Sequence, residues 1–124
     1  MTFLLDTNVL VYGILEPTRI TRAASEVIAS GELYAAAASI YEVGNKHRTG
    51  KLPIPPGPFR ERVGASGVSF VPMDAAVAEL ASSLEWSHRD PWDRIIAAQA
   101  LALGAALVSS DRAYDAVPGL TRLW

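Results

Sequence analysis

Short, continuously apolar runs alternate along the chain with longer segments whose apolar residues recur at helical spacing. The first run, Thr2–Leu5, stops at Asp6, as expected of a strand that is buried on both faces of a sheet. Strands that alternate with helices form a parallel sheet, because each crossover helix returns the chain to the same edge. The pattern therefore predicts an α/β fold with a central parallel sheet of about five strands, flanked by helices on both faces.

Five apolar runs are the candidate strands, and the last is the weakest: Thr2–Leu5, Leu33–Ala36, Ser69–Val71, Ala106–Ser109 and Leu120–Leu123. Residues that cap or stop helices bound the segments between them. The predicted helices are Thr21–Ser30, which Gly31 ends; one from the cap Ser39 to about Thr49; Ala75–Glu85, which Asp74 caps; and one that Asp90 and Pro91 open and that ends before Gly104. The proline-rich segment 51–58 is expected to be a rigid loop between helices.

Composition bounds the class of protein. With 124 residues, 50% hydrophobic and 19% charged, the chain has the size and make-up of one folded domain, residues 1–124. No apolar run approaches the roughly 20 residues that span a bilayer, and Asp6 and Asn8 interrupt the apolar N-terminus, which argues against a signal peptide. The absence of cysteine excludes disulfides and thiolate metal sites. We expect a cytoplasmic protein that does not engage a membrane.

The charge balance limits how the chain can meet nucleic acid. A formal net charge of −2 argues against a protein that coats nucleic acid through a general basic surface. A local binding site is still compatible with that charge. The clearest basic group is Lys46, Arg48 and Lys51 beside His47, although such a run is also typical of a solvated helix end.

Two aspartates follow predicted strands. Asp6 comes directly after the first strand, and Asp111 lies just beyond the run Ala106–Ser109. The carboxyl ends of parallel strands meet at one edge of the sheet, where such folds gather their functional residues. Aspartate also commonly ends a strand and starts a turn, so each residue alone has a structural explanation. Their coincidence is more informative than either residue.

Two further acids are expected in the first turns of helices. Glu42 follows Ser39 by three positions and Asp93 follows Asp90 by three, a spacing that also fits a capping box or a favourable helix dipole. In a doubly wound sheet, the helix N-termini lie on the same side as the strand C-termini. Four acids are therefore predicted to face one cleft: Asp6, Glu42, Asp93 and Asp111.

A site of this kind favours metal-dependent chemistry. Carboxylates crowded in a dry site repel one another, and a bound cation is the usual remedy. Ligands that are all oxygen favour Mg²⁺ or Mn²⁺ over zinc, and such an ion suits hydrolysis of a phosphodiester. Competing motifs are missing: the chain has no phosphate-binding glycine loop, no serine-hydrolase elbow and no second acid two positions after Asp6. His47 and His88 lack metal-ligand spacing and are expected to be surface or loop residues.

Five short motifs occur in order along the chain: LLDTN at 4–8, SIYE at 39–42, KHRTGKL at 46–52, HRDPWDRIIAAQA at 88–100 and LVSSDR at 107–112. Any one of them is a weak signal. The ordered set resembles the PIN-domain ribonucleases, and among them the VapC-like toxins of bacterial toxin–antitoxin pairs, over nearly the whole chain. The departures are small: Ser109 stands where the family often has threonine, and Trp92 where phenylalanine is usual.

The resemblance implies a role for each matching acid. Asp6 and Asp93 match the acids that hold the metal most directly, and Glu42 and Asp111 complete the site. Asp90 matches a family aspartate too, but the helix pattern makes it an N-cap, so it is left out of the metal shell. The implied metal is Mg²⁺, for which Mn²⁺ can substitute.

Polar and basic residues around the acids have implied roles as well. Asn8, Ser39 and Ser109 match polar positions that orient the acids or the metal's waters. Asp115 is either an accessory acid or part of a solvated helix face. The basic residues expected to ring the site and contact RNA phosphates are Lys46, Arg48, Lys51, Arg89, Arg94 and Arg112.

The resemblance also implies partners. The expected substrate is RNA, with structured RNA such as tRNA or rRNA as the leading class and with cleavage specificity set by its loops and exposed bases. Family members frequently form homodimers. They are encoded beside an antitoxin that typically inserts a basic side chain into the acidic cleft, and a cognate antitoxin is therefore expected here.

Two alternatives stay open at the level of sequence. One is a housekeeping RNA-processing nuclease without an antitoxin, which a neighbouring reading frame for a small DNA-binding protein would argue against. The other is a non-catalytic α/β binding module in which the acids serve only as helix caps. Metal-dependent cleavage of RNA separates the module from both nucleases.

Overall fold

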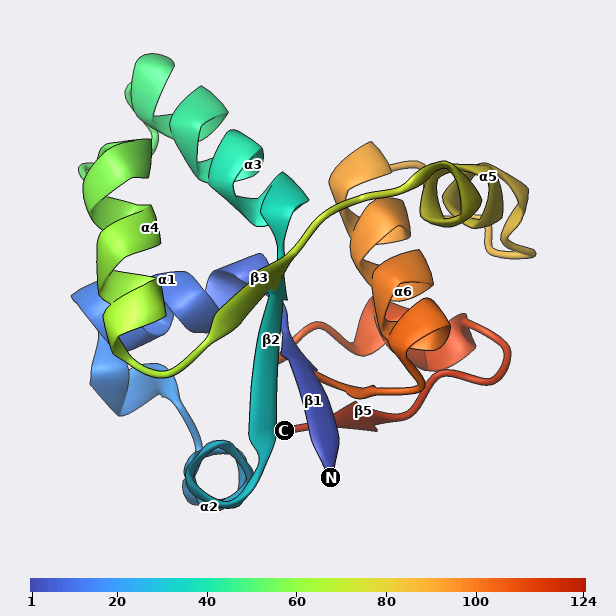
Figure 1. Cartoon of the computed structure of the whole chain (residues 1–124), viewed down its shortest axis with the longest axis horizontal. Coiled ribbons are helices and arrows are strands. Elements are labelled where there is room, and N and C mark those ends of the chain that lie inside the picture. The colour runs from blue at the N-terminus through green and yellow to red at the C-terminus, as the bar shows by residue number, and fades with distance from the viewer.

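The computed structural model describes the whole chain, residues 1–124. At its centre is a sheet of five strands in the order β3-β2-β1-β4-β5, with every neighbouring pair parallel (Figure 1). The strands are β1 Thr2–Leu5, β2 Glu32–Ala36, β3 Ser69–Val71, β4 Ala106–Val108 and β5 Arg122–Leu123. The order reverses direction at the central strand β1, because β2 and β3 lie to one side of it and β4 and β5 to the other. Such a switch point is where open α/β sheets bind their ligands.

Helices cover both faces of the sheet, which confirms the predicted fold class. The helices are α1 Thr7–Leu15, α2 Arg22–Ser30, α3 Ala37–Arg48, α4 Pro56–Ala65, α5 Ala75–Ser83 and α6 Pro91–Leu103, with 3₁₀ turns η1 Pro17–Arg19 and η2 Arg112–Ala116. Helices α3 and α4 lie on one side of the sheet, and α5 and α6 lie on the other (Figure 1). None of the helices is both long and apolar enough to cross a membrane.

The core consists of two layers that β1 separates. Phe3 and Leu5 pack into the layer beneath α1, α2, α3 and α4, whereas Leu4 packs into the layer beneath α6 and η2. Successive side chains of a strand point to opposite faces, so a strand covered on both faces must be apolar at every position. This explains the unbroken apolar run before Asp6.

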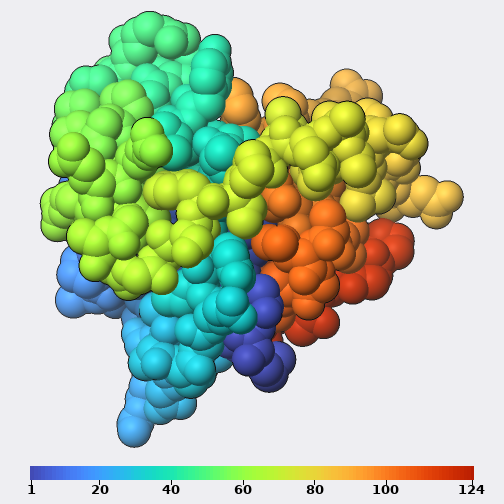
Figure 2. Space-filling model, in the orientation of Figure 1, coloured from blue at the N-terminus to red at the C-terminus, as the bar shows by residue number.

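The surface shows the same division into two lobes. In Figure 2 the segment that follows β3 crosses the front of the molecule and joins the lobe that contains α3 and α4 to the lobe that contains α5 and α6. The strands are all parallel, so their carboxyl ends share one edge of the sheet, and α1, α3 and η2 each begin within a few residues of a strand end. The fold therefore brings three helix or turn N-termini to one place.

Two expectations about helix ends are wrong. Helix α3 begins at Ala37 with Ala36 at its N-cap and no side-chain cap bond, so Ser39 is not the cap and Glu42 lies in the second turn. Helix α5 ends at Ser83, two residues earlier than predicted. Two helix caps expected from sequence are confirmed, namely Asp74 and Asp90, whose side chains each accept a backbone N–H of the first turn. Thr21, expected as the first residue of a helix, is instead the N-cap of α2.

Gly31 ends α2 as predicted, but for a different reason. Its φ of −111° is not in the left-handed region that favours glycine at a helix C-terminus. A Cβ at this position would lie 2.1 Å from the ring of Phe3. The glycine is therefore required because the β1 side chain packs directly against the backbone between α2 and β2.

Candidate active site

Asp6 sits at the carboxyl end of the central strand and is the N-cap of α1. Its backbone N–H still donates to Val108 O in β4, at 3.0 Å, so the sheet holds its main chain rigidly. Its side chain, only 4% exposed, accepts the Thr7 N–H at Oδ1 (2.8 Å) and the Ser109 hydroxyl at Oδ2 (2.6 Å). Sheet and helix cap together fix the direction of this carboxylate.

Ser109 links the ends of the two central strands. It follows β4, is fully buried, and donates its hydroxyl to Asp6 while accepting the Asp111 N–H at 3.1 Å. Asp111 in turn accepts the Ala113 N–H at 2.9 Å and so caps η2. The two strand-end acids are therefore one hydroxyl group apart in the hydrogen-bond network.

Asp93 enters the same region from the first turn of α6. Asp90 caps this helix, since its Oδ1 accepts the N–H groups of Trp92 and Asp93 at 2.9 and 3.2 Å. The Asp93 side chain does not cap the helix, and its Oδ2 lies 2.6 Å from His88 Nε2. The capping-box explanation for Asp93 is therefore wrong, because its carboxylate points toward other side chains and not back to the cap.

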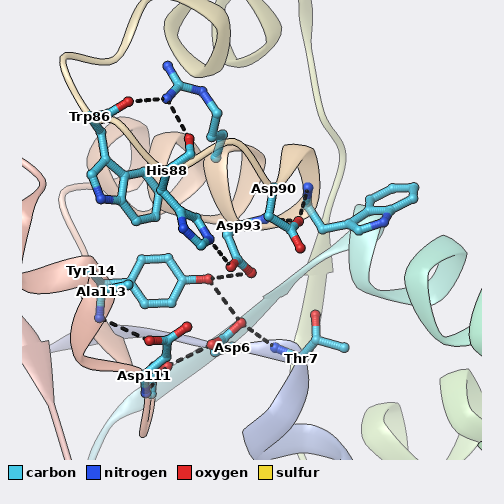
Figure 3. Close-up of polar contacts among 12 residues, drawn as sticks. Asp6, Thr7, Trp86, His88, Asp90, Asp93, Asp111, Ala113 and Tyr114 are labelled. Carbon is cyan, nitrogen blue, oxygen red and sulfur yellow. Dashed lines mark hydrogen bonds and ion pairs between the residues drawn. The ribbon is translucent and has the colours of Figure 1, made fainter.

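Tyr114 lies between Asp6 and Asp93 (Figure 3). Its side chain is fully buried, and its hydroxyl is 3.1 Å from Asp93 Oδ1 and 3.3 Å from Asp6 Oδ1. Burial, followed by the negative charges of Asp6 and Asp93, raises the pKa of the phenol, so the hydroxyl keeps its proton. A neutral donor therefore occupies the space between two carboxylates.

His88 and Tyr114 are functional candidates that the sequence analysis missed. His88 was expected to be an ordinary loop residue, and it lies in a loop, but its ring contacts Asp93 and stacks on Trp86 at a centroid distance of 4.6 Å. Trp86 also stacks on Tyr114, at 5.4 Å. The only sequence signal for Tyr114 is its position three residues after Asp111, which a 3₁₀ turn converts into a side chain directed back at the sheet.

Glu42 reaches the site from α3, which lies on the other side of the sheet from α6 and Asp93 (Figure 1). It is 7% exposed, and its Oε2 accepts a hydrogen bond from Lys46 Nζ at 2.8 Å. Its other oxygen, Oε1, is buried and has no hydrogen-bond partner. Burial acts to lower the pKa of Lys46, but the Glu42 bond and the charges of Asp90 and Asp93 outweigh it, so the pKa is raised. Lys46 therefore lies within the field of the acidic group.

The acids perturb one another electrostatically. Burial raises the pKa of Asp6 to about 7, and the charges of Asp93 and Glu42 add to the rise against the opposing bonds from Ser109 and Thr7. Burial also raises the pKa of Asp93, with help from the charge of Asp90, while hydrogen bonds from His88 and Tyr114 oppose the rise. Near neutral pH Asp6 is thus partly protonated, and a bound cation would displace that proton.

The donor set fits a hard divalent cation. The four acids supply only carboxylate oxygens, and two buried oxygens at the site, Glu42 Oε1 and Asn8 Oδ1, lack a partner. The acids were expected to form a close ring, but they lie farther apart than that. No three acidic or histidine side chains are close enough together to hold a metal ion as they stand. Asp6 and Asp93 share the Tyr114 hydroxyl. Glu42 and Asp111 are near enough for the charge of Glu42 to act on Asp6 and that of Asp111 on Tyr114.

The predicted supporting residues divide into two groups. Ser109 contacts Asp6 directly. The hydroxyl of Ser39 is hydrogen-bonded at 2.8 Å to the hydroxyl of Thr7, the residue that follows Asp6. Asn8 donates to Ser110 Oγ at 3.1 Å. The fourth, Asp115, is a surface residue and not an accessory acid, since both its oxygens accept the guanidinium of Arg122 at 2.8 and 3.1 Å.

Arg94 does not belong with the predicted RNA-binding residues. Its guanidinium donates to four backbone carbonyls at 2.7 to 3.0 Å: that of Ala81 in α5, and those of Leu84, Trp86 and His88 in the loop before α6. Arg94 therefore holds the loop that presents His88 to Asp93. Three other members of the predicted set are exposed at the surface: Lys51, Arg89 and Arg112. Arg48 bonds the side chain of Asn45 on the same helix.

Comparison with known proteins agrees with this architecture. The sequence model of the family described as PIN domain matches residues 3–120. No curated protein matches the chain in sequence. Among solved structures, a chain of VapBC2 from Rickettsia felis, solved with a DNA fragment from its promoter, aligns with a TM-score of 0.73 and 16% identity over 99% of this chain and 98% of that one.

Two further structures align to a similar extent. A chain of DNA-bound VapBC from Salmonella typhimurium gives a TM-score of 0.71 at 17% identity, and one of VapBC-1 from nontypeable Haemophilus influenzae gives 0.70 at 16%. Each alignment covers 99% of this chain and 97% of the other. At this level of identity the likeness concerns the fold, and it extends over nearly the whole chain.

Proposed function

Since the chain belongs to the PIN domain family, we propose that residues 1–124 form one nuclease domain that cleaves RNA phosphodiester bonds with the help of Mg²⁺ or Mn²⁺. The family relationship supports nuclease chemistry. The metal and the RNA substrate are inferences from the acids at the switch point of the sheet. The reaction is proposed to take place in the cytoplasm, among cellular RNA.

The observation that carries the proposal is that two acids from distant parts of the chain meet at one buried hydroxyl group. Asp6 and Asp93 are held against the same phenol hydroxyl, and burial raises the pKa of both. Such an arrangement destabilises the apo protein above neutral pH, because like charges are crowded in a site of low polarity. Perturbed acids in a functional position are characteristic of active sites.

Each residue has a defined task in this proposal. Asp6 and Asp93 would hold the cation, with Glu42 and Asp111 completing its shell. When bound, the cation activates a water molecule and neutralises charge on the phosphate and leaving oxygens. Ser109 holds Asp6 Oδ2 by its hydroxyl, while Oδ1 accepts the Thr7 N–H and lies 3.3 Å from the Tyr114 hydroxyl. Lys46, bonded to Glu42, adds a positive charge at the edge of the acids.

We further propose that the chain is the toxin of a toxin–antitoxin pair. The supporting observation is that three similar solved structures are of VapBC, each with a chain aligned over almost its whole length. The corresponding partner here would be an antitoxin that inhibits the enzyme, and the active form would be a homodimer. Structured RNA such as tRNA or rRNA is the proposed substrate class.

The test is cleavage of total RNA by the purified chain, with Mg²⁺, with Mn²⁺ and with a chelator, followed by mapping of the new ends. We expect defined cuts that require the metal and that Asp6→Asn and Asp93→Asn abolish. Asp74→Asn is the matched control, because Asp74 caps α5 and asparagine caps helices equally well. Metal-independent cuts, or undiminished cleavage by both site variants, would overturn the proposal.

A further inference from the structure

An exposed aromatic pair lies beside the acids. Tyr41 in α3 and Trp92 in α6 stack with their ring centroids 5.3 Å apart and their planes 33° apart. Tyr41 directly precedes Glu42 in the sequence, and Trp92 directly precedes Asp93. The pair therefore joins α3 and α6, the two helices that carry Glu42 and Asp93.

Tyr41 is exposed in a way that packing does not explain. Its side chain is 62% exposed, whereas most large apolar side chains of the protein are buried or half-buried. Trp92, which is half-buried, covers one side of its ring and holds it in place. A ring fixed on one side and open on the other presents a flat surface with little freedom left to lose on binding.

The same face of α3 continues as a polar groove. Asn45 and Arg48 follow Tyr41 at spacings of four and seven, which places the three side chains in a row along one face of the helix. A groove of about 430 Å³ includes all three and is closed on the α4 side by Pro56. Its donors, an amide and a guanidinium bonded to each other, suit phosphate and base oxygens.

We propose that Tyr41 and Trp92 form a stacking platform for one unpaired nucleobase of the RNA, next to the phosphate that is cut. The proposal rests on the proposed function and specifies how that site takes its substrate. Stacking on an aromatic ring is the general way in which proteins bind single-stranded bases, and it requires that the base be unpaired. The platform therefore selects loops and single-stranded segments over duplex, and Asn45 and Arg48 guide the adjoining nucleotide along α3.

Binding measured without cleavage tests the platform directly. The Asp6→Asn chain, in which RNA is not consumed, is titrated with a short single-stranded RNA that carries 2-aminopurine, whose fluorescence falls when the base stacks. We expect quenching on binding, and about tenfold weaker binding when Tyr41→Leu is added, since each stacked base contributes about that factor. Tyr41→Phe retains the ring and should bind as the parent does.

Two controls separate stacking from other effects. Tyr12→Leu is the matched variant, because Tyr12 also packs against a tryptophan, Trp124, but next to the edge strand β5. It should leave RNA binding unchanged. An RNA with a single abasic position in place of the quenched base should bind the parent more weakly than the intact RNA does. The Tyr41→Leu variant should bind both RNAs equally, because it has no ring on which the base could stack.

The outcomes distinguish the platform from the activity. Equal binding by Tyr41→Leu and its parent, in a chain that cleaves RNA, would overturn the platform and leave the nuclease intact. A change in oligomeric state on Tyr41→Leu, seen by light scattering without loss of RNA affinity, would instead assign the pair to contact with a second copy of the chain. An inactive wild-type chain that still shows the tenfold effect would retain the platform and contradict the nuclease.

Discussion

The hydroxyl of Tyr114, in the turn η2, donates to Asp93 Oδ1 in the first turn of α6 at a distance of 3.1 Å (Figure 3). The same hydroxyl is 3.3 Å from Asp6 Oδ1. One phenol proton can serve only one acceptor well at a time. The arrangement therefore stabilises the pair best when one carboxyl group is protonated or when a cation shares their charge.

Tyr114→Phe tests this bridging role. The ring keeps its packing, but the two carboxylates lose a donor, and we expect the free energy of unfolding in chelator to fall by about 1–3 kcal/mol. Added Mg²⁺ should narrow the difference, because a cation compensates the carboxylates in place of the hydroxyl. Chemical denaturation with and without the metal measures both effects. Equal stability of the two proteins in chelator would contradict the bridge.

The pH dependence of stability follows from Asp6. Its pKa is about 7 in the folded chain against an ordinary value of 3.8, so the folded state binds more protons than the unfolded state between about pH 4 and 7. The stability that Asp6 contributes is present at the acid end of this window and is lost as the pH rises through it. In chelator, the stability of Asp6→Asn should decrease less with rising pH than that of wild type, and the variant should be the more stable of the two at pH 8. A wild-type protein whose stability rises across the window, in parallel with the variant, would refute this account.

Ser109 offers a test that preserves the charge of the site. Ser109→Ala removes the donor to Asp6 Oδ2 and the acceptor of the Asp111 N–H, which leaves two buried groups without partners. We expect a loss of about 2 kcal/mol in stability and reduced cleavage. Ser109→Thr keeps the hydroxyl and should retain most of both. Similar behaviour of the alanine and threonine variants would show that the hydroxyl is dispensable.

Arg94 is predicted to act on the loop before α6. Lysine cannot reproduce a planar group that donates to four carbonyls, so Arg94→Lys should cost about 3 kcal/mol and speed hydrogen exchange in residues 84–90. The exposed Arg89 provides the control, since Arg89→Lys alters no such contact. Exchange that rises equally in both variants would argue against the assigned role.

Local patterns predicted the fold well where the information was local. The run Thr2–Leu5 has the observed bounds of β1, because a strand covered on both faces is apolar throughout. Asp90 was identified as a cap because aspartate before proline opens helices by short-range bonding. Ser39 was wrongly predicted to be the cap of α3. The true cap, Ala36, has no side chain that can bond the first turn, and Ser39 is the first residue in this segment of a type that commonly caps helices.

The contents of the site were harder to predict than its position. The acids were singled out because strand ends and helix starts converge at one edge of a parallel sheet. Tyr114 could not be found in the same way, since a lone tyrosine in a mixed polar segment carries no signal for a site, and only the turn η2 directs its hydroxyl at the acids. Arg94 shows the reverse error, because a basic residue beside the motif is committed to loop carbonyls that are close only in the folded chain.

Titration of the chain with Mn²⁺, followed by electron paramagnetic resonance of the free ion, tests the central claim most directly. The account predicts saturable binding by wild type that Asp6→Asn and Asp93→Asn each weaken at least tenfold, about 1.4 kcal/mol, while Asp74→Asn binds as wild type does. Binding that is equally strong in the two site variants would contradict the claim that these acids hold a divalent cation.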